Sequence, residues 1–365
     1  MISKQLPLYD LAEWKNGLAF RKIDFSNKGK PVIKIAELKN GITGQTQFTN
    51  GNYGEAVSLT RGDMVFSWSG NPETSIDVFW YDLPDGWLNQ HIFKVTPSEC
   101  VDKKYLYYLL KSLKPTFTAI ASNKQTTGLG HVTIKDLKEL IIDLPTRSTQ
   151  EAISNYLYAL DSKIHLNKQL NDNLQQQAQA IYASMFVDNA EPTWKQGHLS
   201  DFVIVRYGKD HKKLADGIYP VYGSGGIMRH VERPLYDKES VLIPRKGTLN
   251  NVMYVNQPFW SVDTMFYTEM RQPNVAKFVY HFVKAKDLAS MNAGSAVPSM
   301  TTDILNAMEI VIPPASVLEE FESLVAPMYR AMQENDAQSK KLADLRNALL
   351  PKLMSGEIDV SDIQL

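Results

Sequence analysis

Small polar and basic residues gather in two short loops in the second half of the chain. One loop is Tyr219-Pro-Val-Tyr-Gly-Ser-Gly-Gly226, and the other is Arg245-Lys-Gly-Thr248, which lies between two strand-like segments. Glycines leave backbone N–H groups uncovered, and Arg and Lys add positive charge, so both loops could contact phosphates. Taken alone, each loop is better explained as an ordinary turn, the first as a tight turn that needs glycine and the second as a solvated one.

The sequence lacks the motifs of several catalytic chemistries that act on phosphates or bases. Lys246-Gly-Thr248 has the wrong order for a nucleotide-binding phosphate loop. A DNA methyltransferase needs an Asn/Asp/Ser-Pro-Pro-aromatic motif, but the Pro-Pro pair at 313–314 is followed by alanine and the Asn-Pro pair at 71–72 by glutamate. The seven histidines have no metal-ligand spacing, because His211 and His230 have no adjacent cysteine or partner histidine.

Two long segments with heptad periodicity must position these loops. From Ile153 to Met185, apolar or small residues recur in alternating steps of four and three, and the same register returns from Phe321 to Leu353. This pattern is typical of a helix that packs along its length against another helix, so we expect the two helices to pair with each other. The residues expected in the pairing are Leu157, Leu160, Ile164, Asn167, Leu174, Ile181, Val325, Met328, Met332, Asn335, Leu342 and Leu349.

Two features interrupt the heptads. Asn167 and Asn335 occupy equivalent positions, and a buried polar pair can fix helix register, so we expect them to lie together near the middle of the pair. The alternative is that both face solvent. Pro327 lies inside the second helix and is expected to kink or restart it.

The duplication extends into the segments that precede each helix. Trp87–Phe93 matches Trp260–Phe266, and Lys104–Lys111 matches Lys277–Lys284. The chain is therefore predicted to be a tandem repeat of globular segment plus long helix, an internal dimer rather than a solenoid. The expected divisions are a first globular domain at 1–145, a first helix at 146–190, a second globular domain at 191–313, and a second helix with its tail at 314–365.

Within each globular segment the predicted elements are short. Residues 1–100 are predicted to be mostly strands and turns, and residues 102–122 have helical periodicity. The stretch from Ser122 to Gly130 is predicted to be a polar loop, and the first long helix is expected to begin at Ser148 or Thr149. Together these patterns predict an α+β fold.

Composition and charge favour a globular protein and leave its ligand open. The 365 residues are 44% hydrophobic, which suits two domains with real cores. With no apolar run near the roughly 18 residues of a membrane span and no apolar secretory signal at the start, we expect a cytoplasmic location. The single cysteine, Cys100, has apolar neighbours that predict ordinary packing. The net charge is −1, but each globular segment carries +2 and the helical segments −1 and −4, which permits a nucleic-acid surface without requiring one.

Three motifs in the second half, taken with the duplication, resemble the target-recognition domain of Type I restriction–modification specificity subunits. They are Tyr219–Gly226, Leu242–Thr248 and Phe259–Thr264. The resemblance covers essentially the whole chain and implies two β-rich recognition domains separated by a pair of long antiparallel coiled-coil helices, related by an internal pseudo-twofold repeat. The first half is the poorer match, with Ser67-Trp-Ser-Gly70 where the second has Pro244-Arg-Lys-Gly247. The two halves are therefore expected to read different sequences.

The resemblance also implies a mechanism. Each recognition domain would read one half-site of an asymmetric, bipartite DNA target through the major groove. The helices would set the unread spacer, because about 33 residues at 1.5 Å each make roughly 50 Å of helix, against about 34 Å for one duplex turn.

The same resemblance implies partners. The chain would be non-catalytic and would bind double-stranded DNA and two adenine methyltransferase subunits, with restriction/translocase subunits as further partners. It would hold no cofactor itself, since S-adenosylmethionine and ATP would belong to those partner subunits. The acidic outer faces of the helices, at Glu319, Glu320 and Glu322, are candidates for docking, although such a charge run is usually a solvated face.

The residues expected to contact DNA are loop residues that donate or accept hydrogen bonds. Arg and Lys suit guanine, and Asn and Gln suit adenine, but residue type does not separate base contacts from phosphate contacts. In the first half they are Arg21, Lys22, Ser67, Trp68, Asn71, Asn123, Lys124, Gln125 and Thr126. In the second half they are Lys209, His211, Lys212, Lys213, Ser224, Arg229, Arg245, Lys246, Thr248, Asn250 and Asn251.

Two alternatives remain open at this point. One is a stand-alone DNA methyltransferase, which the missing motifs disfavour. The other is a structural scaffold whose β-rich domains bind protein rather than DNA, which the near-neutral net charge keeps possible.

Overall fold

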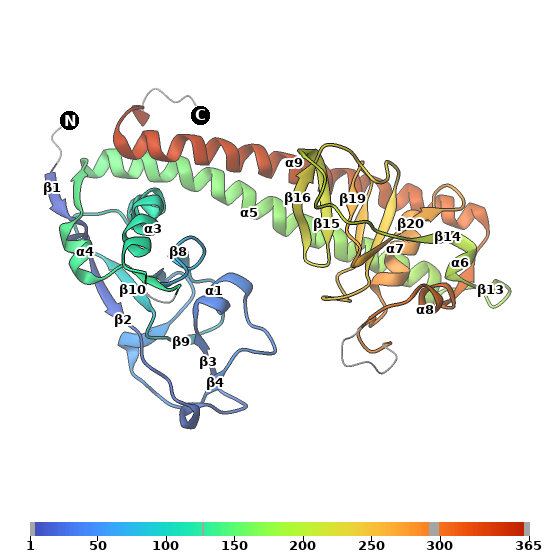
Figure 1. The fold of residues 1–365 in the computed structure, drawn as a ribbon, viewed down its shortest axis with the longest axis horizontal. Coiled ribbons are helices and arrows are strands. Elements are labelled where there is room, and N and C mark those ends of the chain that lie inside the picture. The colour runs from blue at the N-terminus through green and yellow to red at the C-terminus, as the bar shows by residue number, and fades with distance from the viewer. Residues whose placement is uncertain (1–3, 126–127, 292–298, 361–365) are drawn as a thin grey trace. The chain divides into compact units, whose positions relative to one another are not determined.

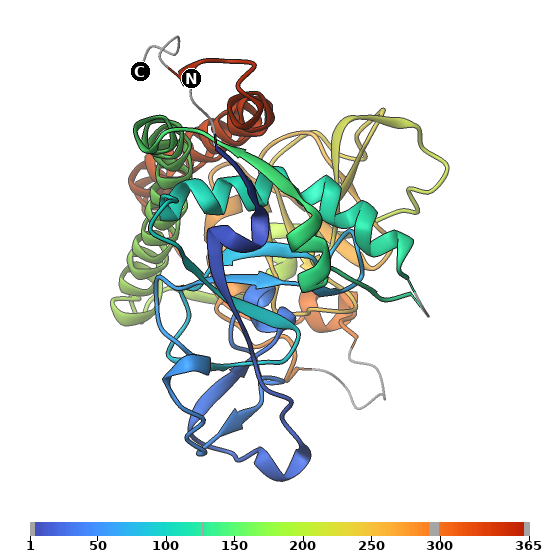
Figure 2. The same ribbon diagram turned by 90° about the vertical axis from the view of Figure 1, so that its left-hand side faces the viewer.

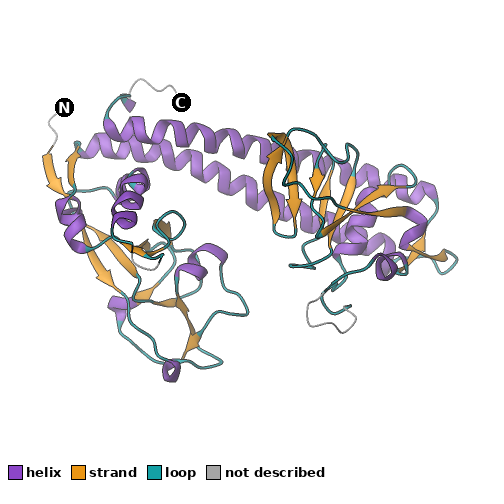
Figure 3. Cartoon of the chain, in the orientation of Figure 1, coloured by secondary structure: helices purple, strands orange, loops and turns teal. Residues whose placement is uncertain are grey.

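A computed structural model describes residues 4–125, 128–291 and 299–360 of the chain. It divides into two compact units, unit 1 with residues 1–165 and 338–365, and unit 2 with residues 166–337. Each unit contains a β-rich domain and one part of each of two long helices, as the colouring by secondary structure in Figure 3 shows. No described helix is long and apolar enough to cross a membrane.

The domain of unit 1 is built on a four-stranded antiparallel sheet in the order β2-β10-β6-β8 (Figure 1). One of its two central strands, β6, is buried along its whole length: the Trp14 ring meets the rings of Phe66 and Phe93 edge-on, and Phe117 packs against Phe66. Helices α2 and α3 lie alongside the sheet in Figure 2. These elements are β2 (Ala12–Asn16), β6 (Met64–Ser67), β8 (Asp77–Trp80), β10 (Ile92–Pro97), α2 (Lys103–Ser112) and α3 (Lys114–Asn123).

Smaller sheets complete unit 1. A second four-stranded sheet has the order β4-β3-β9-β5, with β3 and β9 parallel, and two short antiparallel pairs join β1 to β12 and β7 to β11. The elements are β1 (Lys4–Pro7), β3 (Lys30–Ile33), α1 (Ile35–Asn40), β4 (Phe48–Thr49), β5 (Ser58–Leu59), β7 (Ser69–Gly70), β9 (Gly86–Leu88), β11 (Gly130–His131), α4 (Ile134–Glu139) and β12 (Ile141–Leu144).

The domain of unit 2 has a four-stranded sheet in the order β14-β20-β17-β18 and a three-stranded sheet in the order β16-β15-β19, with β15 and β19 parallel. β13 pairs with β21. The elements are β13 (Lys195–His198), α6 (Leu199–Phe202), β14 (Val203–Tyr207), β15 (Asp216–Gly223), β16 (Gly226–Val231), β17 (Ser240–Pro244), β18 (Met253–Val255), β19 (Trp260–Ser261), β20 (Met265–Met270), α7 (Ala276–Lys284), α8 (Thr302–Asn306) and β21 (Glu309–Ile312).

The two units repeat one topology, which confirms the tandem repeat predicted from the sequence. The sheet order β2-β10-β6-β8 of unit 1 returns as β14-β20-β17-β18, and the parallel pair β3–β9 returns as β15–β19. The helices that follow each sheet, α2 and α7, cover the matched segments that begin at Lys104 and Lys277. The predicted helical stretch 102–122 is two helices rather than one, because Pro115 stands at the start of α3.

The two long helices are α5 (Arg147–Ala183) and α9 (Ala315–Ser355). In unit 1, Asp161 pairs with Arg346, and in unit 2 Asn171 donates to the carbonyl oxygen of Met332 (3.1 Å). Residue numbers on α9 thus fall as those on α5 rise, so the helices pair antiparallel. Their ends are buried in the domain cores, with Leu157 in unit 1 and Val325 in unit 2 fully buried.

The asparagines of the heptads meet in unit 2. Asn167 is 1% exposed and donates to the carbonyl oxygen of Asn335 (3.3 Å), and Asn335 donates to the side-chain oxygen of Asn171 (2.8 Å). Asn171 in turn donates to Asp336 (2.8 Å). Because a buried amide left without partners is costly, a slip of one helix along the other would be penalised here.

The expectations for Cys100 and Glu322 are wrong, and of the two outcomes expected at Pro327 the restart does not occur. The helix continues through Pro327 instead of restarting, and the proline is exposed, so water can reach the carbonyl group that it leaves unbonded. Cys100 is exposed rather than packed. Glu322 is not a free acidic surface residue, because its carboxylate lies 2.7 Å from the ammonium of Lys277, which is almost fully buried.

A buried histidine joins both long helices to the domain of unit 2. His281 on α7 is fully buried, with Nδ1 2.8 Å from the side-chain oxygen of Gln179 on α5 and Nε2 2.9 Å from the hydroxyl of Tyr329 on α9. The neutral ring satisfies both contacts by donating at Nδ1 and accepting at Nε2. Burial lowers the pKa of His281 to about 4.

This histidine predicts an acid-sensitive unit 2. The folded-state pKa lies below the unfolded value of about 6.5, so the stability is complete above about pH 6.5 and falls as the pH drops toward 4. We expect unit 2 to lose about 3 kcal/mol of unfolding free energy across this window, measured by urea denaturation at several pH values. A His281→Gln variant, which cannot titrate there, should lose much less; equal slopes for both proteins would contradict the prediction.

Candidate nucleic-acid interface

In unit 2, the loop of residues 245–248, here called the 245 loop, leaves β17 with its backbone held on both sides. The N–H groups of Arg245 and Lys246 donate to the carbonyl oxygen of Thr264 (2.9 and 3.2 Å), and the N–H of Met300 donates to the carbonyl oxygen of Arg245 (2.9 Å). The guanidinium of Arg245 lies 5.4 Å from the centre of the Tyr207 ring. A ring face and one backbone carbonyl, that of Asp263 at 3.5 Å, leave most of the five guanidinium N–H donors for a ligand.

The glycine-rich turn between β15 and β16 abuts the 245 loop. The side chain of Asn251 donates to the carbonyl oxygen of Ser224 (2.8 Å). Gly247 has φ +84°, and a Cβ there would lie 2.5 Å from the hydroxyl of Ser224. Position 247 therefore requires glycine, both for its backbone conformation and for the close approach of the two loops.

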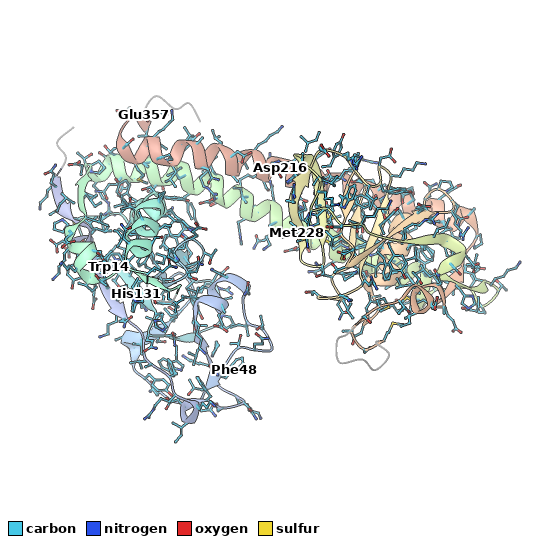
Figure 4. The ribbon with its side chains drawn as sticks, viewed as in Figure 1. Trp14, Phe48, His131, Asp216, Met228 and Glu357 are labelled. Carbon is cyan, nitrogen blue, oxygen red and sulfur yellow. The ribbon has the colours of Figure 1, made fainter. Side chains whose placement is uncertain are left out.

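A surface cavity of about 460 Å³ opens beside these loops. Met228, which Figure 4 labels on the β15–β16 hairpin, is 61% exposed and forms an apolar wall with Val262, while Asp263 and Thr264 supply polar groups. The Nδ1 atom of His211 is enclosed without a hydrogen-bond partner in the described part of the chain. The complete lining is His211, Gly223, Ser224, Gly225, Met228, Val262, Asp263 and Thr264.

Unit 1 has the same backbone arrangement with different side chains. The N–H of Trp68 donates to the carbonyl oxygen of His91 (3.2 Å), and the N–H of Val132 donates to that of Trp68 (2.8 Å). The indole stacks on Phe93 (5.7 Å between ring centres, 27°) and donates through Nε1 to Asn16 (3.1 Å). An aromatic surface thus occupies in unit 1 the position that a cation occupies in unit 2.

Two histidines border the Trp68 ring. The ring centres of His91 and His131 lie 5.7 and 6.2 Å from it, and His131 is labelled in Figure 4. Burial, with a smaller contribution from the charge of His131, lowers the pKa of His91. The neutral ring can donate one hydrogen bond and accept another, and its Nε2 lies 3.2 Å from the side-chain nitrogen of Gln90.

The structure brings part of the predicted set in unit 2 together. Ser224 and Asn251 join the 245 loop, and His211 lines the adjoining cavity with Ser224. Two other side chains are bonded within the protein: Arg229 to Asp216 (2.8 Å), and Asn250 to Asp287 (2.9 Å). The remaining predicted residues are exposed on loops of the same domain: Lys209, Lys212, Lys213 and Thr248.

In unit 1 one predicted contact is wrong and several are engaged elsewhere. Ser67 is fully buried in β6 and donates to the carbonyl oxygen of Ser75 (2.6 Å), so it cannot face a ligand. The side-chain oxygen of Asn71 accepts the N–H groups of residues 73 and 74 and holds a turn. Lys124 pairs with Asp136. Burial raises the pKa of the Asp136 carboxyl, but hydrogen bonds from Lys124 and Thr133 outweigh burial, and the pKa is lowered overall. Arg21, Lys22, Asn123 and Gln125 are exposed, and Thr126 lies outside the described residues.

Sequence reasoning missed the residues that support these two positions. They are Asn16 and His91 in unit 1 and Tyr207, Asp263 and Thr264 in unit 2. The sequence does mark two of these residues, because the matched motifs Trp87–Phe93 and Trp260–Phe266 align His91 with Thr264. Asn16 and Tyr207 end equivalent strands, but no motif marks them.

The described chain thus consists of two repeated β-rich domains, each carrying a clamped loop of polar or aromatic side chains and each joined to the paired helices. The family model for the Type I restriction modification DNA specificity domain matches residues 3–176 and 191–320. The chain belongs to this family, and its role is the recognition of DNA sequence.

Individual relatives agree with this assignment. The Type I restriction enzyme MjaIX specificity subunit of Methanocaldococcus jannaschii is 24% identical, covering 91% of this chain and 90% of the relative. The HindI specificity subunit of Haemophilus influenzae is 21% identical, covering 82% and 87%. The crystal structure of the S subunit of a Type I system from M. genitalium shares the fold, with a TM-score of 0.56, 18% identity, and coverage of 97% and 96%.

Proposed function

We propose that the chain reads a bipartite, asymmetric DNA target, one half-site through each β-rich domain, and that the paired helices set the length of the unread spacer. The observation that carries this proposal is the repeated backbone site with unlike side chains, Trp68 in unit 1 and Arg245 in unit 2. Identical scaffolds with different contact groups suit two different short sequences, because base edges in the major groove differ in their donors, acceptors and methyl groups.

The chain acts, in this proposal, as the non-catalytic subunit of a larger assembly that contains two adenine methyltransferase subunits. Those subunits hold S-adenosylmethionine, and restriction/translocase subunits with ATP complete the restriction form. The long helices supply docking surface, where exposed apolar residues such as Leu166, Leu170 and Leu324 accompany the acidic side chains of Glu319 and Glu320. Exposed apolar side chains on paired helices are a suitable surface for a protein partner.

The adenine methylome of the host, compared with and without this gene, tests the proposal. We expect one motif to lose methylation when the gene is deleted, and that motif to consist of two short blocks around a fixed gap. Restoring the gene on a plasmid should restore the same motif. A methylome that does not change would count against a specificity role and would favour the scaffold alternative, in which the β-rich domains bind protein.

A stand-alone methyltransferase is the other alternative, and the purified chain discriminates it. Incubated with S-adenosylmethionine and target duplex, the chain alone is expected to transfer no methyl group, while addition of the methyltransferase subunits should start the reaction. Methyl transfer by the chain alone would support the alternative.

A further inference from the structure

Trp68 and Arg245 occupy the same place in the repeated fold. Each residue directly follows the strand that pairs with β10 or β20, and its N–H donates to the residue that lies two positions before Phe93 or Phe266. On the other side, each carbonyl oxygen accepts a hydrogen bond from a backbone N–H later in the chain, that of Val132 in unit 1 and that of Met300 in unit 2. The backbone at this position is therefore held by the same pair of hydrogen bonds in both units.

Both side chains also rest on an aromatic ring, which comes from β10 in unit 1 and from β14 in unit 2. Phe93 lies under Trp68, and Phe266 packs against Tyr207 (5.0 Å), whose ring faces the guanidinium of Arg245. Asn16, which binds the indole N–H, and Tyr207 end the equivalent strands β2 and β14. An aromatic floor restricts the side chain above it, so the contact group is held in place before a ligand arrives.

The two side chains offer opposite chemistry. The guanidinium of Arg245 keeps donors in a planar fork, which matches the O6 and N7 acceptors of guanine in the major groove. The indole N–H of Trp68 is already bonded to Asn16 at 3.1 Å, so this ring has only its apolar edge and face to offer. Apolar contact in the major groove suits the methyl group of thymine.

We infer that this shared position selects a base in each half-site, with Arg245 selecting guanine and Trp68 contacting thymine through its methyl group. The inference rests on the proposed bipartite reading and assigns a chemical class of contact to one position in each domain. Cations elsewhere on the second domain, such as Lys212 and Lys213, carry phosphate attraction without base selection, because a lysine ammonium on an exposed loop is not held in a fixed geometry.

The test begins with a random library of DNA duplexes. The full-length chain, assembled with its methyltransferase subunits, selects its targets from this library. For Arg245→Gln we expect the motif of one half-site to lose its guanine at a single position, with the other half-site unchanged. Binding to the original target should weaken about 10-fold or more, as for loss of a bidentate guanine contact. Replacing that guanine by 7-deazaguanine should weaken the wild-type chain and leave Arg245→Gln nearly unaffected.

Arg233→Gln is the matched control. Arg233 is exposed and lies two residues after β16, at the end of the β15–β16 hairpin that is far from the glycine turn. It makes the same charge change, and we expect it to leave the selected motif intact. The remaining positions of the same half-site, if Arg245→Gln still selects them, report that the domain of unit 2 is folded.

The outcomes separate the inference from the proposal on which it rests. Weakening that is uniform over all sequences, with a smaller salt dependence, would make Arg245 a phosphate contact and overturn the inference. Failure of the wild-type chain to select any two-block motif would instead overturn the proposed bipartite reading. For the first domain, Trp68→Phe should keep the thymine and Trp68→Asn should lose it; retention of that thymine in both variants would overturn the assignment of Trp68.

Discussion

Removing one heptad from each long helix is expected to abolish methylation at the natural target and to shorten the spacer of the target that replaces it. The segments to delete are 164–170 and 334–340, which face each other because Asn167 contacts Asn335. Seven residues at 1.5 Å shorten each helix by about 10 Å, equal to about three base pairs of 3.4 Å. Deleting a whole heptad keeps the order of apolar positions on both sides of the cut.

These segments are the right ones because the domain cores do not depend on them. The residues that bury the helix ends, such as Leu157 and Leu353 in unit 1 and Val325 in unit 2, all lie outside the deletions. Within the deletions most side chains are exposed, and Asn167 is the buried exception. Both domains should therefore keep their folds and their half-site sequences.

The measurement is the methylome or the selected motif of the variant, and an insertion supplies the control of opposite sign. Duplicating the same two heptads should lengthen the spacer by the same amount, while both half-sites stay as in the wild type. An unchanged spacer in both variants would show that the helices do not set it. Loss of one half-site sequence would show that a domain had been damaged instead.

Phe321→Ala is expected to destabilise unit 2 by about 3–5 kcal/mol. Phe321 is fully buried on α9, and its ring meets those of Phe186 and Tyr182 edge-on at 5.2 and 6.2 Å and that of His281 at 6.0 Å. Alanine would remove these contacts and leave a cavity among rigid rings that cannot easily collapse. Because typical domains have only about 5–15 kcal/mol of stability, the loss should be visible in function as well.

Hydrogen exchange by mass spectrometry resolves this effect by unit. We expect faster exchange across the core of unit 2, around Phe278 and Val325, and little change in the core of unit 1, which is a separate cluster. Leu324→Ala is the control on the same helix, since Leu324 is 46% exposed and should change stability by about 0.5 kcal/mol or less. Equal effects of the two substitutions would contradict the role assigned to Phe321.

The repeat, the long helices and the order of domains could all be predicted from the sequence. Heptad spacing and duplication are local or periodic patterns, and they specify a helix with one apolar stripe wherever it packs. The asparagines illustrate the limit, because their equivalent positions were visible but the chain of bonds from Asn167 through Asn335 and Asn171 to Asp336 depends on the antiparallel alignment.

The contact residues were harder to predict. Lists drawn from polarity and loop position included Ser67, whose hydroxyl is buried in a strand, and Asn71, whose carboxamide holds a turn. Small polar residues serve turns and strand ends as readily as ligands. The same lists omitted Tyr207, whose ring lies against the guanidinium of Arg245.

The sequence by itself thus determined that this protein is a duplicated pair of β-rich domains on long helices. Only the tertiary structure decided that the backbones of Trp68 and Arg245 are held by the same pair of hydrogen bonds, and that His281 and Lys277 join the long helices to the domain of unit 2. The physical reason is that these relations join residues far apart in the chain. Their geometry follows from strand pairing and core packing, which local patterns do not specify.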